Sequence, residues 1–387
     1  MLTGLTRRNA TILVVTILAI SLHLLAFQVE KSSPDMNTWL TVGRAASLGQ
    51  DFYKAASPTV TELPYWYPPL WGLVLGALGL MVNPESSPVL YALILRLLLM
   101  AADLAAGFML LRWFKVGLFY FAFWLLNPLV IATAQSGQFD IVPALFTLLA
   151  LVAHRNDRGH LSGFLLGVGF AFKFWPVVAV PLLIADHRRD QFRYAWKVLL
   201  STGVTIAASC LPFLYTTQFA FNVANSWLIQ GPLSRIGLGL GPVPILVAAT
   251  ILLVIPGFVQ SRLRIELVWI LGFIMVLVLT LFTLASNTYI QYSLWSLPFL
   301  VIIWAQSRSI MLGAMTNVLW LLYVLERYGQ LLAKITGVTL NIGAYIFQGA
   351  YFLLLLSLLW ILFDKHADRT SRVDSRNGTI NPRTHDG

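Results

Sequence analysis

The chain has 387 residues, of which 58% are hydrophobic and only 11% are charged. It has too little polar surface to cover a soluble globule, and its single cysteine, Cys210, excludes an internal disulfide, so the composition indicates an integral membrane protein. The formal net charge of +10 is scattered between apolar runs without a basic motif, which argues against a nucleic-acid-binding module and makes the cations markers of membrane topology.

The apolar runs predict an all-α polytopic membrane protein with about 12 transmembrane helices. We expect spans near 11–28, 88–111, 116–134, 138–153, 161–172, 175–185, 196–213, 241–259, 265–284, 291–306, 310–325 and 341–363. The two pieces that flank Lys173 are each shorter than the roughly 20 residues that a spanning helix needs, so a broken hairpin is predicted there. Residues 1–365 are predicted to form one transmembrane domain, followed by a disordered cytoplasmic tail over 366–387.

The segment 68–82 decides the topology, because it is apolar but short and begins with two prolines. If this segment crossed the membrane, every later loop would lie on the opposite side, and only Arg7 and Arg8 would stay on the side assigned to them below. If it does not cross, one side collects most of the cations and is cytoplasmic by the positive-inside rule; these are Arg7, Arg8, Arg112, Lys115, Arg155, Arg158, Arg188, Arg189, Arg193, Lys197, Arg262, Arg264, Arg308, Lys365, Arg369, Arg372, Arg376 and Arg383.

We therefore expect 68–82 to be an interfacial helix within one long external loop, 29–87. Both termini are then expected in the cytoplasm, with the protein in a bacterial plasma membrane and its functional residues on the external face.

Polar residues gather in the segments that open to this external face. Asp35 follows the first span, Gln138 and Asp140 lie in the turn after Asn127-Pro128, and Lys173 lies at the tip of the broken hairpin. Plain structural interpretations also exist: Asp35 and Asp140 as helix caps, and Lys173 as a side chain that snorkels outward. An intramembrane cation beside aromatic residues and a proline is nevertheless a functional candidate, with an anion as its partner.

Other polar and aromatic residues suggest structural roles. Arg96 and Asp103 are seven residues apart on one predicted helix and so share a face, where we expect contacts within the bundle. Trp and Tyr residues near the ends of spans are expected to anchor helices at the membrane interface.

The external residues suit a transfer reaction at the outer leaflet. An acceptor hydroxyl needs a base to take its proton, and a phosphate leaving group needs fixed cations as its charge develops. Asp35 offers the base, and Lys173 and Arg235 offer the cations.

The order and spacing of several short motifs resemble the GT-C superfamily of glycosyltransferases. Within it, the chain is most similar to bacterial mannosyltransferase-like proteins that use polyprenyl-phosphate sugars and to the first mannosyltransferases of GPI-anchor synthesis. The motifs that carry the resemblance lie within residues 1–300: Asp35, Gly49-Gln50-Asp51-Phe52-Tyr53, Tyr67-Pro68-Pro69-Leu70, Asn127-Pro128, Gly137-Gln138-Phe139-Asp140, Lys173-Phe174-Trp175-Pro176 and Gln291-Tyr292-Ser293-Leu294-Trp295.

The resemblance implies a GT-C-like helical bundle and an inverting enzyme that moves a sugar from a polyprenyl-phosphate carrier to a lipid or glycan hydroxyl. It implies Asp35 as the general base and Lys173 and Arg235 as ligands of the donor phosphate. The sugar or acceptor would contact Gln138, Asp140, Tyr292, Arg44 and Tyr67. Members of the superfamily often have two acidic residues separated by one position in this loop. Here the sequence is Asp35-Met36-Asn37, so we predict transfer without a metal or other cofactor.

Two alternatives remain open at this point. A transporter or flippase of a lipid-linked saccharide would also have a broken helix and a buried cation, although the sequence has no convincing internal repeat. A ligase that joins a lipid-linked glycan to another lipid would use a pyrophosphate-linked donor. A flippase needs Lys173 but not Asp35, which distinguishes it from a transferase.

Overall fold

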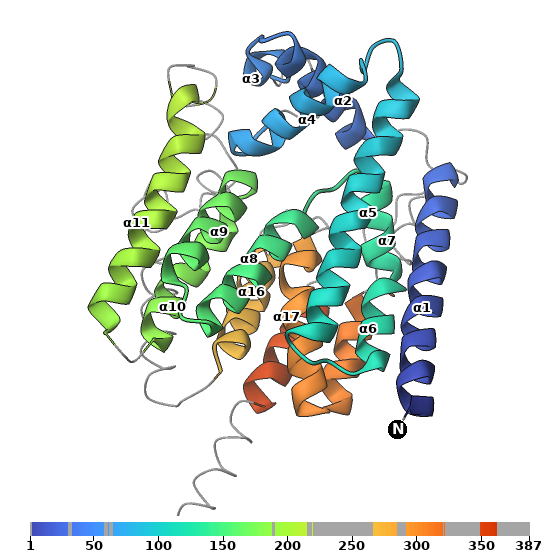
Figure 1. Cartoon of the computed structure of the whole chain (residues 1–387), viewed down its shortest axis with the longest axis vertical. Coiled ribbons are helices and arrows are strands. Elements are labelled where there is room, and N and C mark those ends of the chain that lie inside the picture. The colour runs from blue at the N-terminus through green and yellow to red at the C-terminus, as the bar shows by residue number, and fades with distance from the viewer. Residues whose placement is uncertain are drawn as a thin grey trace, which may run out of the picture.

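The computed structural model describes residues 2–29, 33–57, 61, 65–187, 190–214, 219, 266–284, 292–319, 321 and 349–361, and every regular element in these segments is helical. Helices α1 (Leu2–Val29), α5 (Pro88–Arg112) and α11 (Gln191–Cys210) run between the two ends of one bundle (Figure 1). The other helices are α2 (Pro34–Ser47), α3 (Phe52–Ala55), α4 (Pro69–Met81), α6 (Leu118–Leu125), α7 (Pro128–Gln135), α8 (Ile141–Arg155), α9 (Gly159–Phe172), α10 (Ala179–Asp186), α16 (Leu267–Leu284) and α17 (Ser293–Ser307), with short 3₁₀ turns η1 (Trp175–Val178) and η2 (Leu211–Phe213).

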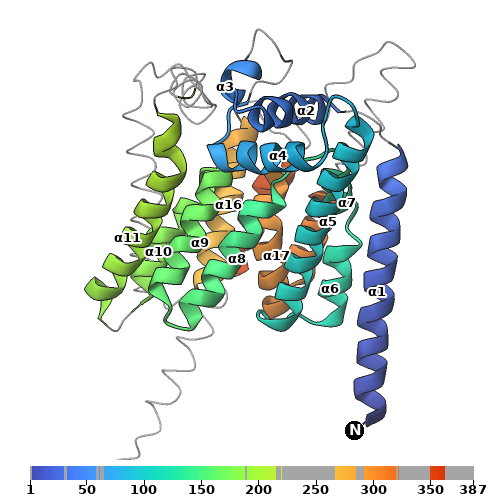
Figure 2. The ribbon, with the colours of Figure 1, turned by 45° about the horizontal axis from the view of Figure 1, so that its top comes forward.

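Helices α2 and α4 lie across one end of the bundle, at the end opposite the N-terminus (Figure 2). The predicted helix over 68–82 is thus present as α4, in the orientation expected of an interfacial helix; the side of the membrane on which it lies stays a prediction. Small residues let α2 pack closely against α4 and α5. A Cβ added to Gly79 would lie 2.7 Å from the Gly43 carbonyl oxygen, and one added to Gly43 would lie 2.1 Å from Tyr91 Oη. Tyr91 Oη also donates a hydrogen bond to the Leu75 carbonyl, 2.9 Å away, which ties α4 to α5.

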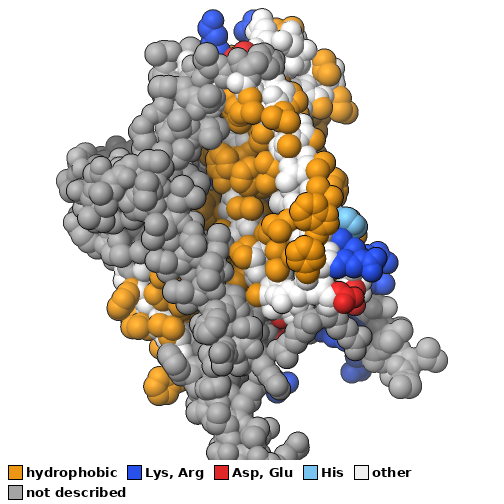
Figure 3. All heavy atoms as spheres, turned by 90° about the vertical axis from the view of Figure 1, so that its left-hand side faces the viewer, with side chains coloured by type: hydrophobic (Ala, Val, Ile, Leu, Met, Phe, Trp, Pro, Cys, Tyr) orange, Lys and Arg blue, Asp and Glu red, His pale blue; other side chains and the backbone are white. Residues whose placement is uncertain are grey.

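Four of the described helices are long and apolar enough to cross a membrane: Arg7–Gln28, Pro88–Arg112, Leu118–Gln135 and Gln191–Phe213. Eight shorter apolar helices accompany them. The face on the α11 side carries apolar side chains along its height, with Lys and Arg in its lower part and at its top (Figure 3). On α11, the side chains of Phe192, Trp196 and Val204 are more than half exposed, as expected beside lipid. The predicted span 241–259 and the tail 366–387 lie outside the described residues, so the number of about 12 spans stays a prediction.

Two breaks between helices lie just before prolines, Pro128 and Pro176. The predicted break at Lys173 is confirmed, since α9 ends at Phe172 and η1 begins at Trp175. The expected span 116–134 corresponds to the candidate span Leu118–Gln135, within which the chain breaks locally between α6 and α7. Pro128 disfavours a helical conformation at Asn127, which instead has ψ of 121° and caps α7 by accepting a 2.9 Å hydrogen bond from the Leu129 amide.

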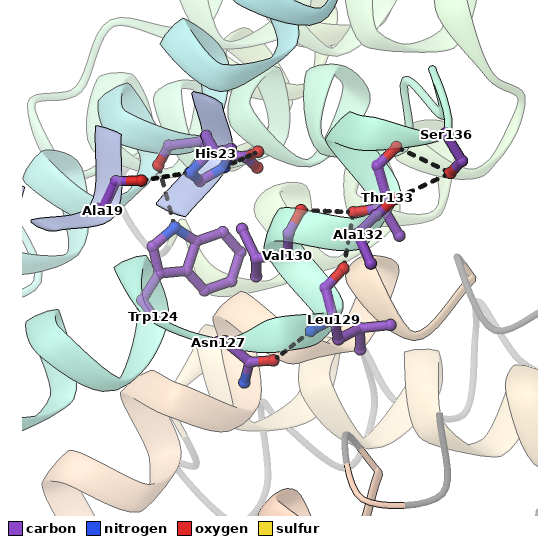
Figure 4. Close-up of polar contacts among 10 residues, drawn as sticks. Ala19, His23, Trp124, Asn127, Leu129, Val130, Ala132, Thr133 and Ser136 are labelled. Carbon is purple, nitrogen blue, oxygen red and sulfur yellow. Dashed lines mark hydrogen bonds and ion pairs between the residues drawn. The ribbon is translucent and has the colours of Figure 1, made fainter. Parts of the chain in front are cut away.

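A polar cluster ties α1 to α5 and α6 inside the bundle. His23 Nε2 lies 3.5 Å from Asp103 Oδ2, and Trp124 Nε1 donates to the Asp103 carbonyl at 3.0 Å (Figure 4). On the same face of α5, Arg96 Nε donates to the Gln135 carbonyl at 2.7 Å. Arg96 and Asp103 therefore make contacts within the bundle, as predicted. These bonds also position α7, from which the chain turns into α8.

Candidate functional site

Asp35 lies in the first turn of α2, at the end of the bundle that α2 and α4 cover. Ser33 caps this helix by accepting a 3.1 Å hydrogen bond from the Met36 amide, and Pro34 occupies the first helical position. Asp35 is thus not the cap residue, and its carboxylate is available for another contact. Oδ2 of Asp35 accepts a hydrogen bond from Nε2 of Gln138.

The turn between α7 and α8 is held in place by α2. Ser33 Oγ donates to the Ser136 carbonyl at 2.8 Å, and Trp39 Nε1 donates to the Gly137 carbonyl at 2.9 Å. Gly137 has φ of +80°, and a Cβ there would lie 2.8 Å from the terminal methyl carbon of Met36, so only glycine fits without strain. This turn sets Gln138 against Asp35.

Asp140 follows in the same turn, and its carboxylate points into the protein. Its Oδ1 accepts from Lys173 Nζ at 2.5 Å and from Trp295 Nε1 at 2.6 Å. Although Asp140 immediately precedes α8, its side chain makes no capping hydrogen bond, so the interpretation of Asp140 as a helix cap is wrong. The carboxylate instead joins the α9–η1 break to the start of α17.

Lys173 is only 4% exposed, and its ammonium group sits among aromatic rings. Nζ lies 5.0–5.5 Å from four ring centroids, those of Phe139, Tyr67, Tyr292 and Trp295. Such cation–π contacts are strongest where water is excluded. Lys173 therefore does not snorkel to the surface; it is a buried cation paired with Asp140 and enclosed by these four rings, which we call the aromatic cage.

The electrostatic setting raises the pKa of Asp35 to about 6, from an ordinary value of 3.8. Partial burial is the largest cause, because it disfavours the charged form. The positive charge of Lys173 and the hydrogen bond from Gln138 oppose that shift, whereas the negative charge of Asp140 adds to it. A carboxyl group with this pKa is ionised at neutral pH yet basic enough to accept a proton.

Three buried polar atoms around this group have no hydrogen-bond partner within the described part of the chain: Gln138 Oε1, Asp140 Oδ2 and Trp175 Nε1. The Trp175 ring stacks on that of Trp295, with centroids 6.0 Å apart. Buried polar groups are nearly always satisfied, so unpaired acceptors and a donor beside aromatic faces suit a ligand rich in hydroxyl groups.

Not all of the predicted site residues come together. Asp35, Gln138, Asp140, Lys173, Tyr67 and Tyr292 do. Arg44 does not, because it lies in the last turn of α2, where its guanidinium forms an exposed 3.0 Å ion pair with Glu85. Arg235 lies outside the described residues. No group of three His, Cys, Asp or Glu side chains suited to a metal occurs among those that are described, and metal independence stays a prediction.

Three aromatic residues of the site were not assigned roles from the sequence: Phe139, Trp175 and Trp295. Each lies inside one of the motifs quoted above, next to or near a polar residue that was assigned. Their positions near helix ends resemble those of residues that anchor helices at the membrane interface. Only the close approach of α8, η1 and α17 shows that these three residues line the site instead.

A comparison with protein families places the candidate site within a known family. The model of glycosyltransferase family 87 (GT87) matches residues 65–286, more than half of the chain. This range includes Tyr67, Gln138, Asp140 and Lys173, while Asp35 precedes it and Tyr292 follows it.

Two curated proteins share shorter stretches with the chain. GPI mannosyltransferase 1 of Eremothecium gossypii is 34% identical over 111 residues, which are 27% of this chain and 28% of that protein. GPI mannosyltransferase 1 of Kluyveromyces lactis is 31% identical over 103 residues, which are 25% of this chain and 26% of that protein. The chain thus spans little more than a quarter of the length of these relatives.

Proposed function

Because the chain belongs to glycosyltransferase family 87, we propose that it is an inverting glycosyltransferase that moves mannose from a polyprenyl-phosphate carrier to a hydroxyl group of a lipid or glycan. The names of the two relatives support mannose as the sugar. The reaction takes place at the end of the bundle covered by α2 and α4, which we assign to the non-cytoplasmic face.

One observation carries the proposal: a carboxyl group suited to act as a base and a buried cation lie in one site. Asp35, with a pKa of about 6, is hydrogen-bonded to Gln138. Two residues after Gln138, Asp140 pairs with Lys173 in the aromatic cage. A base and a buried cation in one site match the two needs of glycosyl transfer from a phosphate. Binding or transport of the same lipid would give no reason for a carboxyl group tuned to accept protons near neutral pH.

In the proposed reaction Asp35 takes the proton of the acceptor hydroxyl. The acceptor oxygen bonds to the anomeric carbon from the side opposite the phosphate, and the bond between that carbon and the phosphate oxygen breaks. Its electron pair stays on the phosphate, which gains a second negative charge, and the sugar is transferred with inversion.

Lys173 is the group that we propose to stabilise this leaving phosphate. An ammonium carries three N–H donors, of which one is directed to Asp140. In a site that excludes water, a fixed positive charge stabilises developing negative charge more strongly than in solvent. Arg235, as a second ligand of the phosphate, remains part of the proposal.

Gln138 and Asp140 are proposed to bind hydroxyl groups of the sugar or acceptor. Gln138 Oε1 and Asp140 Oδ2 are acceptors without a partner in the described segments, and the Trp175–Trp295 stack offers an aromatic face nearby. Aromatic faces beside hydrogen-bond acceptors suit a sugar, whose C–H and O–H groups point in different directions.

The test uses the purified full chain in detergent with a short-chain polyprenyl-phosphate mannose, radiolabelled in the sugar, and a crude lipid extract. We expect label in a new lipid product of inverted anomeric configuration, together with release of polyprenyl phosphate. If label stays on the donor, and if glucose and arabinose carriers also fail, the transferase proposal is wrong. Movement of intact donor across liposomes would then identify the chain as a flippase.

A further inference from the structure

A second pocket lies at the end of the bundle opposite Asp35, between the start of α1 and the turn from α5 into α6. Its volume is about 680 Å³. Three cations line it together with apolar and aromatic side chains; the lining residues are Arg8, Ile12, Phe108, Leu111, Arg112, Trp113, Lys115 and Val116. Figure 1 shows this end of α1 at the N-terminus, far from α2 and α4.

Two of the cations of the pocket lie at the ends of candidate membrane spans, where lipid head groups are expected. Arg8 is at the start of the apolar span Arg7–Gln28, and Arg112 is the last residue of the span Pro88–Arg112. Trp113, next to Arg112, is 46% exposed and is of the type that gathers at this boundary. The pocket is therefore within reach of a lipid that stands in the surrounding bilayer.

The positive charge of the pocket is not neutralised by the part of the protein that the structure describes. Arg8, Arg112 and Lys115 are exposed, and none of them takes part in an ion pair among the described residues. Lys115, three residues after the end of α5, has φ of +55°, in the left-handed region that is uncommon for lysine. Within the described segments the three positive charges are therefore available to an anionic ligand.

The apolar side of the pocket leads along the helices toward the hydrocarbon. Ile12 is one turn beyond Arg8 on α1, and Phe108 is one turn before Arg112 on α5. Phe108 is 39% exposed, and farther along α1 Leu13, Val14 and Ile17 are each more than half exposed. A ligand with a charged phosphate at one end and acyl chains at the other would match both parts.

We propose that this pocket binds the head group of an anionic diacyl phospholipid, with Arg8, Arg112 and Lys115 around the phosphate and the acyl chains against Ile12 and Phe108. Basic pockets between transmembrane helices hold such head groups, and each cation near a membrane surface adds about 1 kcal/mol of attraction. The site is separate from the Asp35 site and does not depend on the proposed reaction.

Trp113 supplies the signal for a test. The full chain in detergent is titrated with phosphatidylglycerol brominated on its acyl chains, which quenches nearby tryptophan fluorescence, and with brominated phosphatidylcholine as the neutral lipid. The difference between wild type and Trp113→Phe isolates the signal of Trp113. We expect quenching of Trp113 at a lower lipid fraction with phosphatidylglycerol, and a preference that falls about fivefold in Arg112→Gln.

The matched control is Arg158→Gln, which removes an exposed cation at the α8–α9 turn, outside the pocket. It should leave the preference unchanged, whereas Arg8→Gln/Arg112→Gln/Lys115→Asn should abolish it at an unchanged Tm. The proposal would be overturned by equal quenching by the two lipids, by an equal loss in Arg158→Gln, or by displacement of brominated lipid by inorganic phosphate at constant ionic strength. The last would make the pocket a site for free phosphate. Stronger quenching by a brominated polyprenyl phosphate than by phosphatidylglycerol would also contradict it.

Discussion

Asp140 Oδ1 and Lys173 Nζ lie 2.5 Å apart within the aromatic cage, although the two residues are 33 positions apart in the sequence and α8 and α9 lie between them. This ion pair couples the positions of two predicted site residues, because a displacement of the Asp140 carboxylate would also displace the ammonium group of Lys173. Burial makes each partner depend on the other, since a buried charge without its counter-ion is costly.

Lys173→Met should therefore have two separable effects. It leaves Asp140 buried with only Trp295 as a partner, at a cost of roughly 3–5 kcal/mol, and it removes the cation proposed to hold the donor phosphate. Adding Asp140→Asn should restore most of the thermal stability in detergent but not the binding of donor. The control is Lys54→Met, at an exposed position in α3, which should change neither the thermal stability nor the binding of donor. Donor binding recovered by the double variant would remove Lys173 from that role.

The rate of transfer should depend on pH through Asp35. The base is the ionised form, so the rate is predicted to be level above about pH 7 and to fall roughly tenfold per unit below the pKa of about 6. Gln138→Leu removes a hydrogen bond that lowers this pKa. The variant should therefore shift the acidic limb of the kcat/KM profile to higher pH. An acidic limb near pH 4 in wild type, or one unmoved by Gln138→Leu, would contradict the assignment of the base.

Gly137→Ala should disturb the turn that aligns Gln138 with Asp35. The backbone at Gly137 has φ of +80° and a Cβ would meet Met36, whereas Gly49 has φ of +69° with open space around it. Gly49→Ala is thus a control for backbone strain alone, which costs about 1–2 kcal/mol. We expect Gly137→Ala to lose more stability than Gly49→Ala and, unlike it, to lower the rate of transfer. Equal losses in both variants would mean that the Met36 contact has no consequence.

Arg44→Gln should leave transfer unchanged, in spite of the location of Arg44 in the same external loop as Asp35. Its ion pair with Glu85 is exposed, and such pairs contribute about 0–1 kcal/mol. The assay compares kcat and KM for donor and acceptor with those of Glu85→Gln, which breaks the same pair from the other side. A rise in KM in Arg44→Gln alone would return Arg44 to the acceptor site.

The sequence was sufficient to predict which polar residues converge, because the ordered motifs around Asp35, Asp140 and Lys173 place all three at one end of the bundle. The helix break at Lys173 was also predictable from the shortness of its two flanking apolar runs. The position of Arg44 was predictable in principle: nine residues along α2 correspond to two and a half turns, which puts Arg44 on the side of the helix opposite Asp35.

The aromatic cage was not predictable in the same way. Tyr67, Phe139, Tyr292 and Trp295 come from three stretches of the chain that are far apart in sequence, and each alone has the features of an interface anchor. Likewise, the pattern around Asp140 suggested a helix cap, because a carboxylate before an apolar helix is a common start signal. Tertiary contacts with Lys173 and Trp295 take the carboxylate away from the backbone of α8.

The most direct test of the central claim compares transfer by Asp35→Asn with transfer by Asp51→Asn. Both changes remove one carboxylate charge from the same external loop without a change in size, and Asn can replace Asp51 as the cap of α3. With equal amounts of folded protein, the account predicts that Asp35→Asn loses transfer by at least about 100-fold, as for removal of a general base, while Asp51→Asn keeps it. Transfer retained by Asp35→Asn, with an unchanged acidic limb in its pH profile, would contradict the account.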